Sequence, residues 1–295
     1  MNFKELPIVF DCEGSELVGM IHLPESPCAR GMLSIVAGGP QYRGGVGRLQ
    51  VQMARQLAAA GVPVMRFDYR GLGDGEGRFR GFQDVEADLR AAVRAFRESA
   101  PQVREVVLWG GCDAAAAIMI NAWKLPEVTG IVTGNPWVHT AETGDAVIVK
   151  HHFRKRMKEA DFWLKVLRLE YNPLPALATL ARSALYKLRP RRSEARTVGG
   201  ALDDPSKPFV PRMRAGLTQF KGDMLLLMSG RSLVSKEFDD LVASQPMWQA
   251  ALRAKRSFAR HDMPDSDQTY SSIGSRREVI ETTRRWMLDP HSALG

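Results

Sequence analysis

The sequence predicts an α/β fold, with a mostly parallel central sheet, helices on both faces and an inserted helical cap. Short β-rich runs alternate with helical patterns from residue 1 to residue 139. The alternation stops over residues 140–220, where helical patterns are separated by prolines, and it resumes over 221–295. We therefore expect a core in two parts, with residues 140–220 covering the carboxyl edge of the sheet, where such folds place their sites.

Hydrophobic periodicity predicts the individual elements. Two opening strands are expected at Leu6–Phe10 and Glu16–Leu23, joined by a turn at Glu13–Gly14. Further strands are expected at Met32–Ala37, Val62–Phe67, Glu105–Trp109, Val128–Thr133, Met224–Met228 and Ser257–Met263. Helices are expected at Val46–Ala60, Asp84–Glu98, Asp113–Trp123, Ser235–Ala243 and Arg276–Met287. This order of elements is typical of parallel sheets with crossover helices.

Composition is that of an ordinary globular protein. The 295 residues are 44% hydrophobic and 25% charged, which is enough apolar material for a full core. The start, MNFKELPIVFDCEG, lacks the features of a secretory signal, and no apolar run is long enough for a membrane span. Three scattered cysteines fit a reducing compartment. We expect a cytoplasmic protein, and no cofactor, because no metal-ligand spacing or nucleotide fingerprint is present.

The net charge of +8 is concentrated in the expected cap. Residues 150–196 contain 13 Lys or Arg and 4 Asp or Glu. Such a surface attracts phosphates, acidic glycans or anionic lipid, and it is equally typical of a solvated helical face. Apolar residues beside this stretch leave a peripheral membrane contact as a weaker alternative to a cap closing over a pocket. No nucleic-acid reading motif is present, so we expect no nucleic-acid partner.

The stretch LWGGCDAAAA, Leu108–Ala117, predicts a sharp turn from a strand into a helix. A nucleophile elbow has the form G-x-S-x-G; here Gly110 and Ala114 occupy the small positions and Cys112 replaces the serine. A helix N-terminus favours a thiolate, so position alone is expected to activate Cys112 in part. The alternative is a small buried cysteine in a tight turn.

An elbow requires two N–H donors for an oxyanion. The N–H of Asp113, the residue after the nucleophile, is one candidate. The loop VAGGPQYRGG supplies the other: Pro40 has no N–H, so Gly39 is the first candidate and Gln41 the second. A glycine turn without such a role is the alternative. FDYRGLGDGEG, residues 67–77, is expected to organise the floor of the site through an Asp–Arg pair.

These motifs together resemble one family. GGPQYR, FDYRGLGDGEG, LWGGCDAAAA, NPWVHT, VKHHF and SGRSLVSKEF resemble the exosortase A system-associated hydrolases, type 1, over essentially the whole chain. The resemblance implies an α/β-hydrolase fold with a helical cap and a Cys-Asp-His triad. It also implies a cytoplasmic protein linked with exopolysaccharide production and protein sorting in Gram-negative bacteria.

The resemblance keeps the nucleophile, Cys112, but not its two partners. The family pattern places the acid at Ser232 of SGRSLVSKEF and the base at Gln268 of SDQTYS. Gln cannot take a proton from a thiol, and Ser cannot stabilise an imidazolium. The loss of the base at position 268 accounts for the loss of the acid at position 232, because an acid that orients the base has no role without it.

Other side chains are candidates to replace the lost partners. Glu237 and Asp239 follow Ser232 and offer a carboxylate. His139 follows the sixth strand and is the most plausible replacement base, although a lone His is more often structural. His261 lies too far back along the last strand, and the cap offers His151 and His152.

Two functions therefore stay open. One is a hydrolase or acyl transferase in which Cys112 attacks an ester or thioester of a small acyl or glycan-lipid substrate. The other is a catalytically inactive homologue that acts as a binding or scaffold protein, with contact to a membrane or export machinery as a further expectation.

Overall fold

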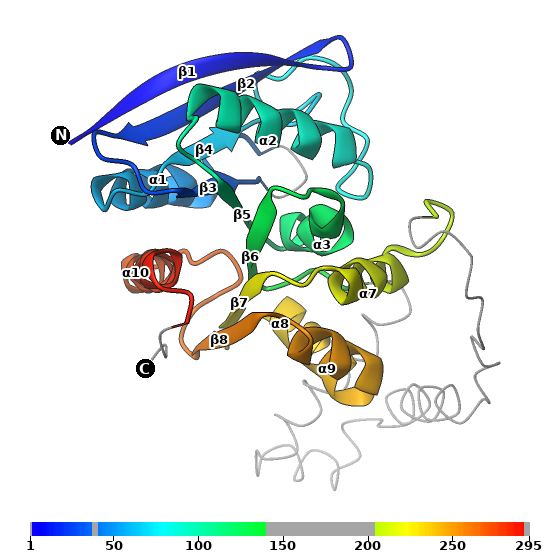
Figure 1. Cartoon of the computed structure of the whole chain (residues 1–295). Helices are drawn as coiled ribbons and strands as arrows, with labels where there is room; N and C mark the ends of the chain where they lie inside the picture. Colours follow the sequence, from blue (N-terminus) through cyan, green and yellow to red (C-terminus); the bar gives the residue numbers. More distant parts are fainter. Residues whose placement is uncertain (1, 37–40, 140–203, 292–295) are drawn as a thin grey trace, which may run out of the picture. The chain divides into compact units, whose positions relative to one another are not determined.

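The computed structural model describes residues 2–36, 41–139 and 204–291. Eight strands form one sheet in the order β1-β2-β4-β3-β5-β6-β7-β8 (Figure 1). The strands are β1 (Phe3–Cys12), β2 (Ser15–Pro24), β3 (Arg30–Ser34), β4 (Val64–Phe67), β5 (Glu105–Gly111), β6 (Val128–Gly134), β7 (Asp223–Ser229) and β8 (Ser257–Met263). β1 and β2 are antiparallel to their neighbours, and β3 to β8 are parallel. The predicted fold class is confirmed.

Local sequence explains the opening hairpin. Cys12 pairs with Ser15, which leaves Glu13 and Gly14 as the two central residues of the turn. Both have positive φ, 52° and 81°, as two-residue turns between right-twisted strands require. The turn predicted at Glu13–Gly14 is confirmed.

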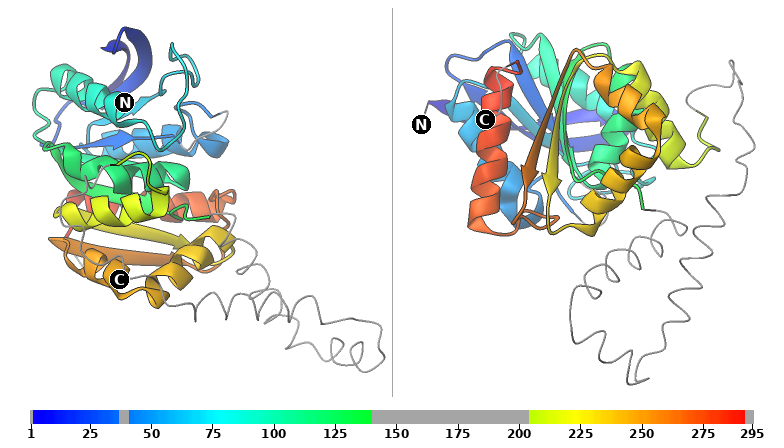
Figure 2. Two further views of the ribbon diagram at one scale, coloured as in Figure 1. Left: turned by 90° about the vertical axis from the view of Figure 1, so that its right-hand side faces the viewer. Right: turned by 90° about the horizontal axis from the view of Figure 1, so that it is seen from below.

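Helices cover both faces of the sheet (Figure 2). They are α1 (Leu49–Ala59), α2 (Glu86–Ser99), α3 (Asp113–Asn121), α7 (Phe209–Gln219), α8 (Leu233–Ser244), α9 (Pro246–Arg253) and α10 (Ile273–Leu288), with short 3-10 turns η1 (Val46–Arg48) and η2 (Ala122–Lys124). α1 and α10 lie together on one face, and the other helices lie on the opposite face. The core on the α1–α10 face joins Met53, Leu57, Val279 and Trp286 to the central strands.

The chain divides into two compact units. One contains Met1–Trp137 and Leu202–Gly295, and the other contains Val138–Ala201. The expected cap falls largely on residues outside those that the structure describes. Within the described residues, no helix combines the length and apolar character needed to cross a membrane.

Helix α7 corrects the predicted boundary at residue 220. We placed residues 209–219 in the inserted block, but α7 belongs to the unit that contains the sheet. A Cβ at Gly216 would lie 2.3 Å from the carbonyl oxygen of Met119, so α7 approaches α3 at backbone distance. The sequence pattern does not predict this packing, because it depends on a single glycine, Gly216, and not on a periodic pattern of apolar residues.

Candidate active site

Cys112 occupies a strained turn between β5 and α3. Its φ is 57° and its ψ −122°, a conformation that L-residues rarely adopt. Its N–H donates to the carbonyl of Gly134 at 2.8 Å, and its carbonyl accepts from the N–H of Trp137 at 3.1 Å. These backbone bonds hold the strained residue between the ends of β5 and β6. The predicted elbow geometry is therefore present.

The small residues on either side of Cys112 are required by close packing. A Cβ added to Gly110 would lie 2.9 Å from the Cβ of Ala114 and 3.0 Å from the Cδ1 of Ile118. Cβ atoms do not approach so closely, and Ala114 is buried. The expectation that Gly110 and Ala114 allow the helix to pack against the strand is confirmed.

The thiol of Cys112 is protonated at neutral pH. Burial, with the nearby Asp113 carboxylate second, raises its pKa to about 11, and hydrogen bonds from Gln268 and the Asp113 backbone oppose this only in part. A pKa of about 11 leaves on the order of 10⁻⁴ of the thiol ionised at pH 7. The expected activation of Cys112 by its position at the helix terminus is wrong in direction, because desolvation outweighs it.

Gln268 lies directly against this thiol. Its Nε2 donates to the Sγ of Cys112 at 3.2 Å, across 156 residues of sequence. The structure thus brings together positions 112 and 268, as the family pattern implies. The contact is a hydrogen bond from an amide, and an amide has no basicity with which to ionise a thiol.

Asn135 fixes the backbone that carries Gln268. Its Nδ2 donates to the carbonyl of Gln268 at 3.0 Å and to the Oγ of Ser229 at 2.9 Å. Its Oδ1 accepts from the N–H of Ser229 at 2.8 Å and from the Oγ of Ser235 at 2.7 Å. Asn135 is buried and has a φ of 45°. We call these contacts the Asn135 clamp, because one amide joins the ends of β6 and β7, helix α8 and the loop after β8.

Ser232 has a different role from that of a catalytic acid. It is buried at the N-cap of α8, and its Oγ accepts from the N–H of Ser235 at 3.3 Å. A serine in this position satisfies one of the free N–H groups of the first helical turn. The backbone N–H of the preceding residue, Arg231, donates to the carbonyl of Ser266 at 3.0 Å, so the loops after β7 and β8 lie side by side.

The loop VAGGPQYRGG, which was expected to supply an oxyanion donor, is anchored at Arg43. Gly39 lies outside the described residues, and Gln41 is half-buried. Two groups of Arg43, its backbone N–H and its guanidinium, donate to the buried carboxylate of Asp68. The same guanidinium donates to Asp74 at 2.7 Å.

An Asp–Arg pair was expected within residues 67–77. Asp68 of this segment instead pairs with Arg43, which lies outside it. Within the segment, Arg70 instead pairs with Asp88 at 2.9 Å. The backbone N–H of Asp113, the second predicted donor, contacts the Cys112 thiol and holds its pKa down slightly.

Two of the alternative groups, His261 and Asp239, have ion-pair partners of their own, on α10 and β8. His261 bonds Glu278 at 2.9 Å on β8 and α10, and Asp239 pairs with Arg260 at 2.7 Å. Glu237 is buried within α8. His139 belongs to the unit Val138–Ala201. His151 and His152 lie outside the described residues.

Two residues of the site were missed by sequence reasoning. Asn135 precedes Pro136 at the end of a strand, and an Asn–Pro pair in that place is a signal for a turn of special conformation. Tyr270 has a φ of 54°, is buried, and reaches Gly134, where a Cβ would lie 2.6 Å from its hydroxyl. Burial raises the pKa of Tyr270, so its phenol stays neutral.

Comparisons with known proteins find similarity of fold. No protein-family model and no curated protein sequence matches the chain. An esterase from Pyrococcus furiosus superposes with a TM-score of 0.62 at 12% identity, over 97% of this chain and 91% of that chain. Dienelactone hydrolase from Anabaena variabilis gives 0.57 at 13% identity, over 98% of each chain. Est1E from Butyrivibrio proteoclasticus, solved with ferulic acid bound, gives 0.57 at 14% identity, over 96% of this chain and 98% of that chain.

Identities this low carry information about fold and not about activity. This chain has six parallel strands and a strained elbow after β5, and its fold superposes on those of the esterase and the dienelactone hydrolase. The chain has the α/β-hydrolase fold.

Proposed function

We propose that this chain is a hydrolase homologue that binds an ester or thioester ligand at Cys112 and turns it over poorly or not at all. The observation that supports this is the Gln268 amide on the Cys112 thiol, at 3.2 Å, where a triad enzyme needs a base. The solved neighbours are named as an esterase and a dienelactone hydrolase, which is why an ester-like ligand is the first class to test.

The chemistry of the site explains why turnover is poor. Acylation needs a thiolate, and the raised pKa of Cys112 keeps the thiol protonated. Deacylation needs an activated water, which neither Gln268 nor Ser232 supplies. A site stripped of its base keeps only the contribution of ligand binding and of the oxyanion donors, several powers of ten below a complete triad.

A slow cysteine hydrolase is the second candidate, and the strained backbone of Cys112 favours it. A φ of 57° costs of order 1–3 kcal/mol, and a residue that only packs in a turn has no need of it. In this alternative Glu237 takes the proton of the Cys112 thiol, the sulfur bonds to the acyl carbon, and the alcohol or thiol of the ester leaves with that proton. The N–H groups of Gly39 or Gln41 and Asp113 hold the oxyanion, and water then hydrolyses the acyl-enzyme to free Cys112.

The wider setting of the function is proposed from the family resemblance alone. It implies the cytoplasm and exopolysaccharide metabolism, and a small acyl or glycan-lipid ligand is our own proposal for the site. Contact with a membrane or with export machinery through the basic residues 150–196 belongs to the same proposal.

The test is steady-state turnover of a panel of acyl thioesters and aryl esters by the wild-type chain and by Cys112→Ala. Intact-mass measurement under the same conditions detects an acyl adduct. We expect the chain to bind the ligand and to show no turnover that depends on Cys112. Turnover abolished by Cys112→Ala would establish the second candidate instead. Stoichiometric acylation without turnover would mean that attack survives and that only deacylation is lost.

A further inference from the structure

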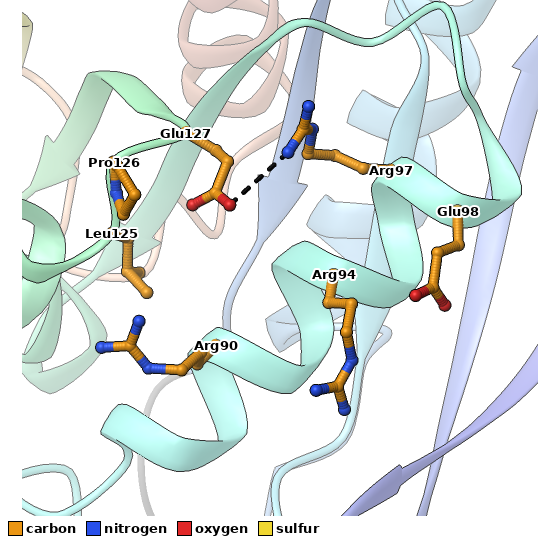
Figure 3. A pocket seen from close by; sticks show the side chains of 7 residues that line it. All are labelled: Arg90, Arg94, Arg97, Glu98, Leu125, Pro126 and Glu127. Carbon is orange, nitrogen blue, oxygen red and sulfur yellow. Dashed lines mark hydrogen bonds and ion pairs between the residues drawn. The ribbon is translucent and has the colours of Figure 1, made fainter.

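A hollow lined by arginines lies away from the candidate active site. Its cavity volume is about 420 Å³, and its lining comes from one face of α2 and from the segment Leu125–Glu127 (Figure 3). The N–H of Val106, at the start of β5, donates to the carbonyl of Glu127 at 3.0 Å. Cys112 follows the other end of β5, so the hollow is at the amino edge of the sheet and the thiol at the carboxyl edge.

Three arginines form a row along this hollow. Arg90, Arg94 and Arg97 are spaced four and three residues apart on α2, so they share one face of the helix. The helical rise separates them by roughly 6 and 4.5 Å along the axis. In an extended peptide, side chains that point the same way are roughly 6.6 Å apart. Acidic residues at alternate positions of such a peptide come within about 2 Å of each interval, a difference that long arginine side chains can span.

The carboxylates beside the three arginines neutralise their positive charge only weakly. Arg90 pairs with Glu86 at 2.8 Å, and Arg97 with Glu127 at 3.5 Å, and all four side chains are at least one-third exposed. Exposed pairs of this kind stabilise the fold very little, so an incoming carboxylate can replace them. Arg94 donates to the carbonyl of Asp11 at 3.4 Å, and no described carboxylate lies within ion-pair distance of it.

A second hollow adjoins the first and is more apolar. Its cavity volume is about 330 Å³, and it shares Leu125 and Pro126 with the arginine hollow. Trp123 and Phe220 contribute aromatic surface to it. Over the two hollows together, the charged residues of the lining are five Arg or Lys and two Glu. The combined surface thus offers a cationic row followed by a place for a bulky apolar side chain.

We propose that these two hollows form a docking site for an acidic peptide segment of a partner protein. Alternate Asp or Glu residues of the segment pair with Arg90, Arg94 and Arg97, and an aromatic or branched residue next to them enters the hollow beside Trp123. Arginine clusters recognise acidic motifs in this way, and apolar anchors add specificity. The proposal does not rest on the function of Cys112, which lies at the opposite edge of the sheet.

The test is fluorescence anisotropy with the full chain and a labelled ten-residue peptide. The probe carries glutamate at alternate positions and a phenylalanine–leucine pair at one end. We expect saturable binding that weakens at least fivefold with Arg94→Glu. Arg277→Glu is the matched control, because Arg277 is exposed on α10 and the charge change is identical. This control is expected to leave the affinity within twofold of wild type.

Two peptide variants separate the two hollows. Glutamine in place of the glutamates is expected to abolish binding, and alanines in place of the apolar pair are expected to weaken it severalfold. Equal weakening by Arg94→Glu and Arg277→Glu would overturn the site, because binding would then be due to net charge. Absent binding of the acidic probe, or tighter Arg94-dependent binding to anionic vesicles, would overturn the acidic-peptide partner.

Discussion

The end of β5 and the ends of β7 and β8 meet at one corner of the molecule, and they differ in what they retain. After β5, the backbone of Cys112 has the strained geometry of an elbow and the small neighbours it needs. After β7 and β8, the backbone also brings the expected positions close, but the side chains are Ser232 and Gln268. The comparison teaches that the placement of a catalytic site and its proton chemistry are separable properties of the chain.

The largest expected effect comes from restoring the missing chemistry. Gln268→His together with Ser232→Asp puts an imidazole against the thiol on a loop that the Asn135 clamp already holds. General base catalysis contributes about 10²–10⁴-fold, so we expect ester or thioester hydrolysis to rise by at least about 100-fold in kcat/KM. The same double variant with Cys112→Ala is the control and is expected to be inactive. A folded double variant without any gain would show that the oxyanion side is incomplete as well.

Removing the Asn135 clamp tests how far the stability of this corner depends on one side-chain amide. Asn135→Leu leaves the N–H of Ser229, the hydroxyl of Ser235 and the carbonyl of Gln268 without their partner. Each unsatisfied buried group costs about 1–3 kcal/mol, so we expect the free energy of unfolding to fall by about 3 kcal/mol in chemical denaturation.

A matched control for the clamp is Asn121→Leu. Asn121 is equally buried, but its side chain makes one bond, to the carbonyl of Ala117 in its own helix, at 3.0 Å. Its replacement is expected to cost clearly less than that of Asn135. Equal losses would mean that the clamp stabilises the fold no more than any buried asparagine does.

The state of the thiol gives the third prediction. Because burial raises the pKa of Cys112 to about 11 from an ordinary value of 9.0, its thiolate fraction at pH 8 is about 100-fold below that of an unshifted thiol. The rate of alkylation by iodoacetamide is expected to rise about tenfold per pH unit from pH 7 to pH 10. Cys112→Ser provides the background from Cys12 and Cys28. A plateau near pH 8 would reveal an activated nucleophile and would support the slow-hydrolase alternative.

Much of this corner was predictable from sequence, and the reason is local. Gly110, Cys112 and Ala114 lie within five residues, so the constraint of a tight turn on residue size is visible in the chain itself. Strand and helix periodicity likewise predicted the parallel sheet. The meeting of Cys112 and Gln268 followed only from the family resemblance, since 156 residues separate them.

The parts that were missed depend on contacts between distant segments. Asn135 bonds residues 94, 100 and 133 positions away, and no periodic pattern records such bonds. Arg43 reaches Asp68 in the same way, although each lies in a recognisable motif. The pKa of Cys112 was expected in the wrong direction because sequence shows a helix terminus but not the depth of burial.

Substitution of Ser232 is expected to have the smallest effect. It also distinguishes a position that still acts on the thiol from one that only caps a helix. Its Oγ caps α8 through the N–H of Ser235, so Ser232→Ala is expected to lower the free energy of unfolding by about 1 kcal/mol. Ser272→Ala is the matched control, because Ser272 caps α10 through the N–H of Ser275 at 3.0 Å.

Similar losses in both serine variants, with an unchanged rate of Cys112 alkylation in Ser232→Ala, are expected if Ser232 serves only the helix. A changed alkylation rate in Ser232→Ala alone would mean that this position still acts on the thiol. Ser232→Asp keeps a good capping residue. The acid needed for a restored triad is therefore compatible with the cap, and stability does not explain why a serine stands at this position.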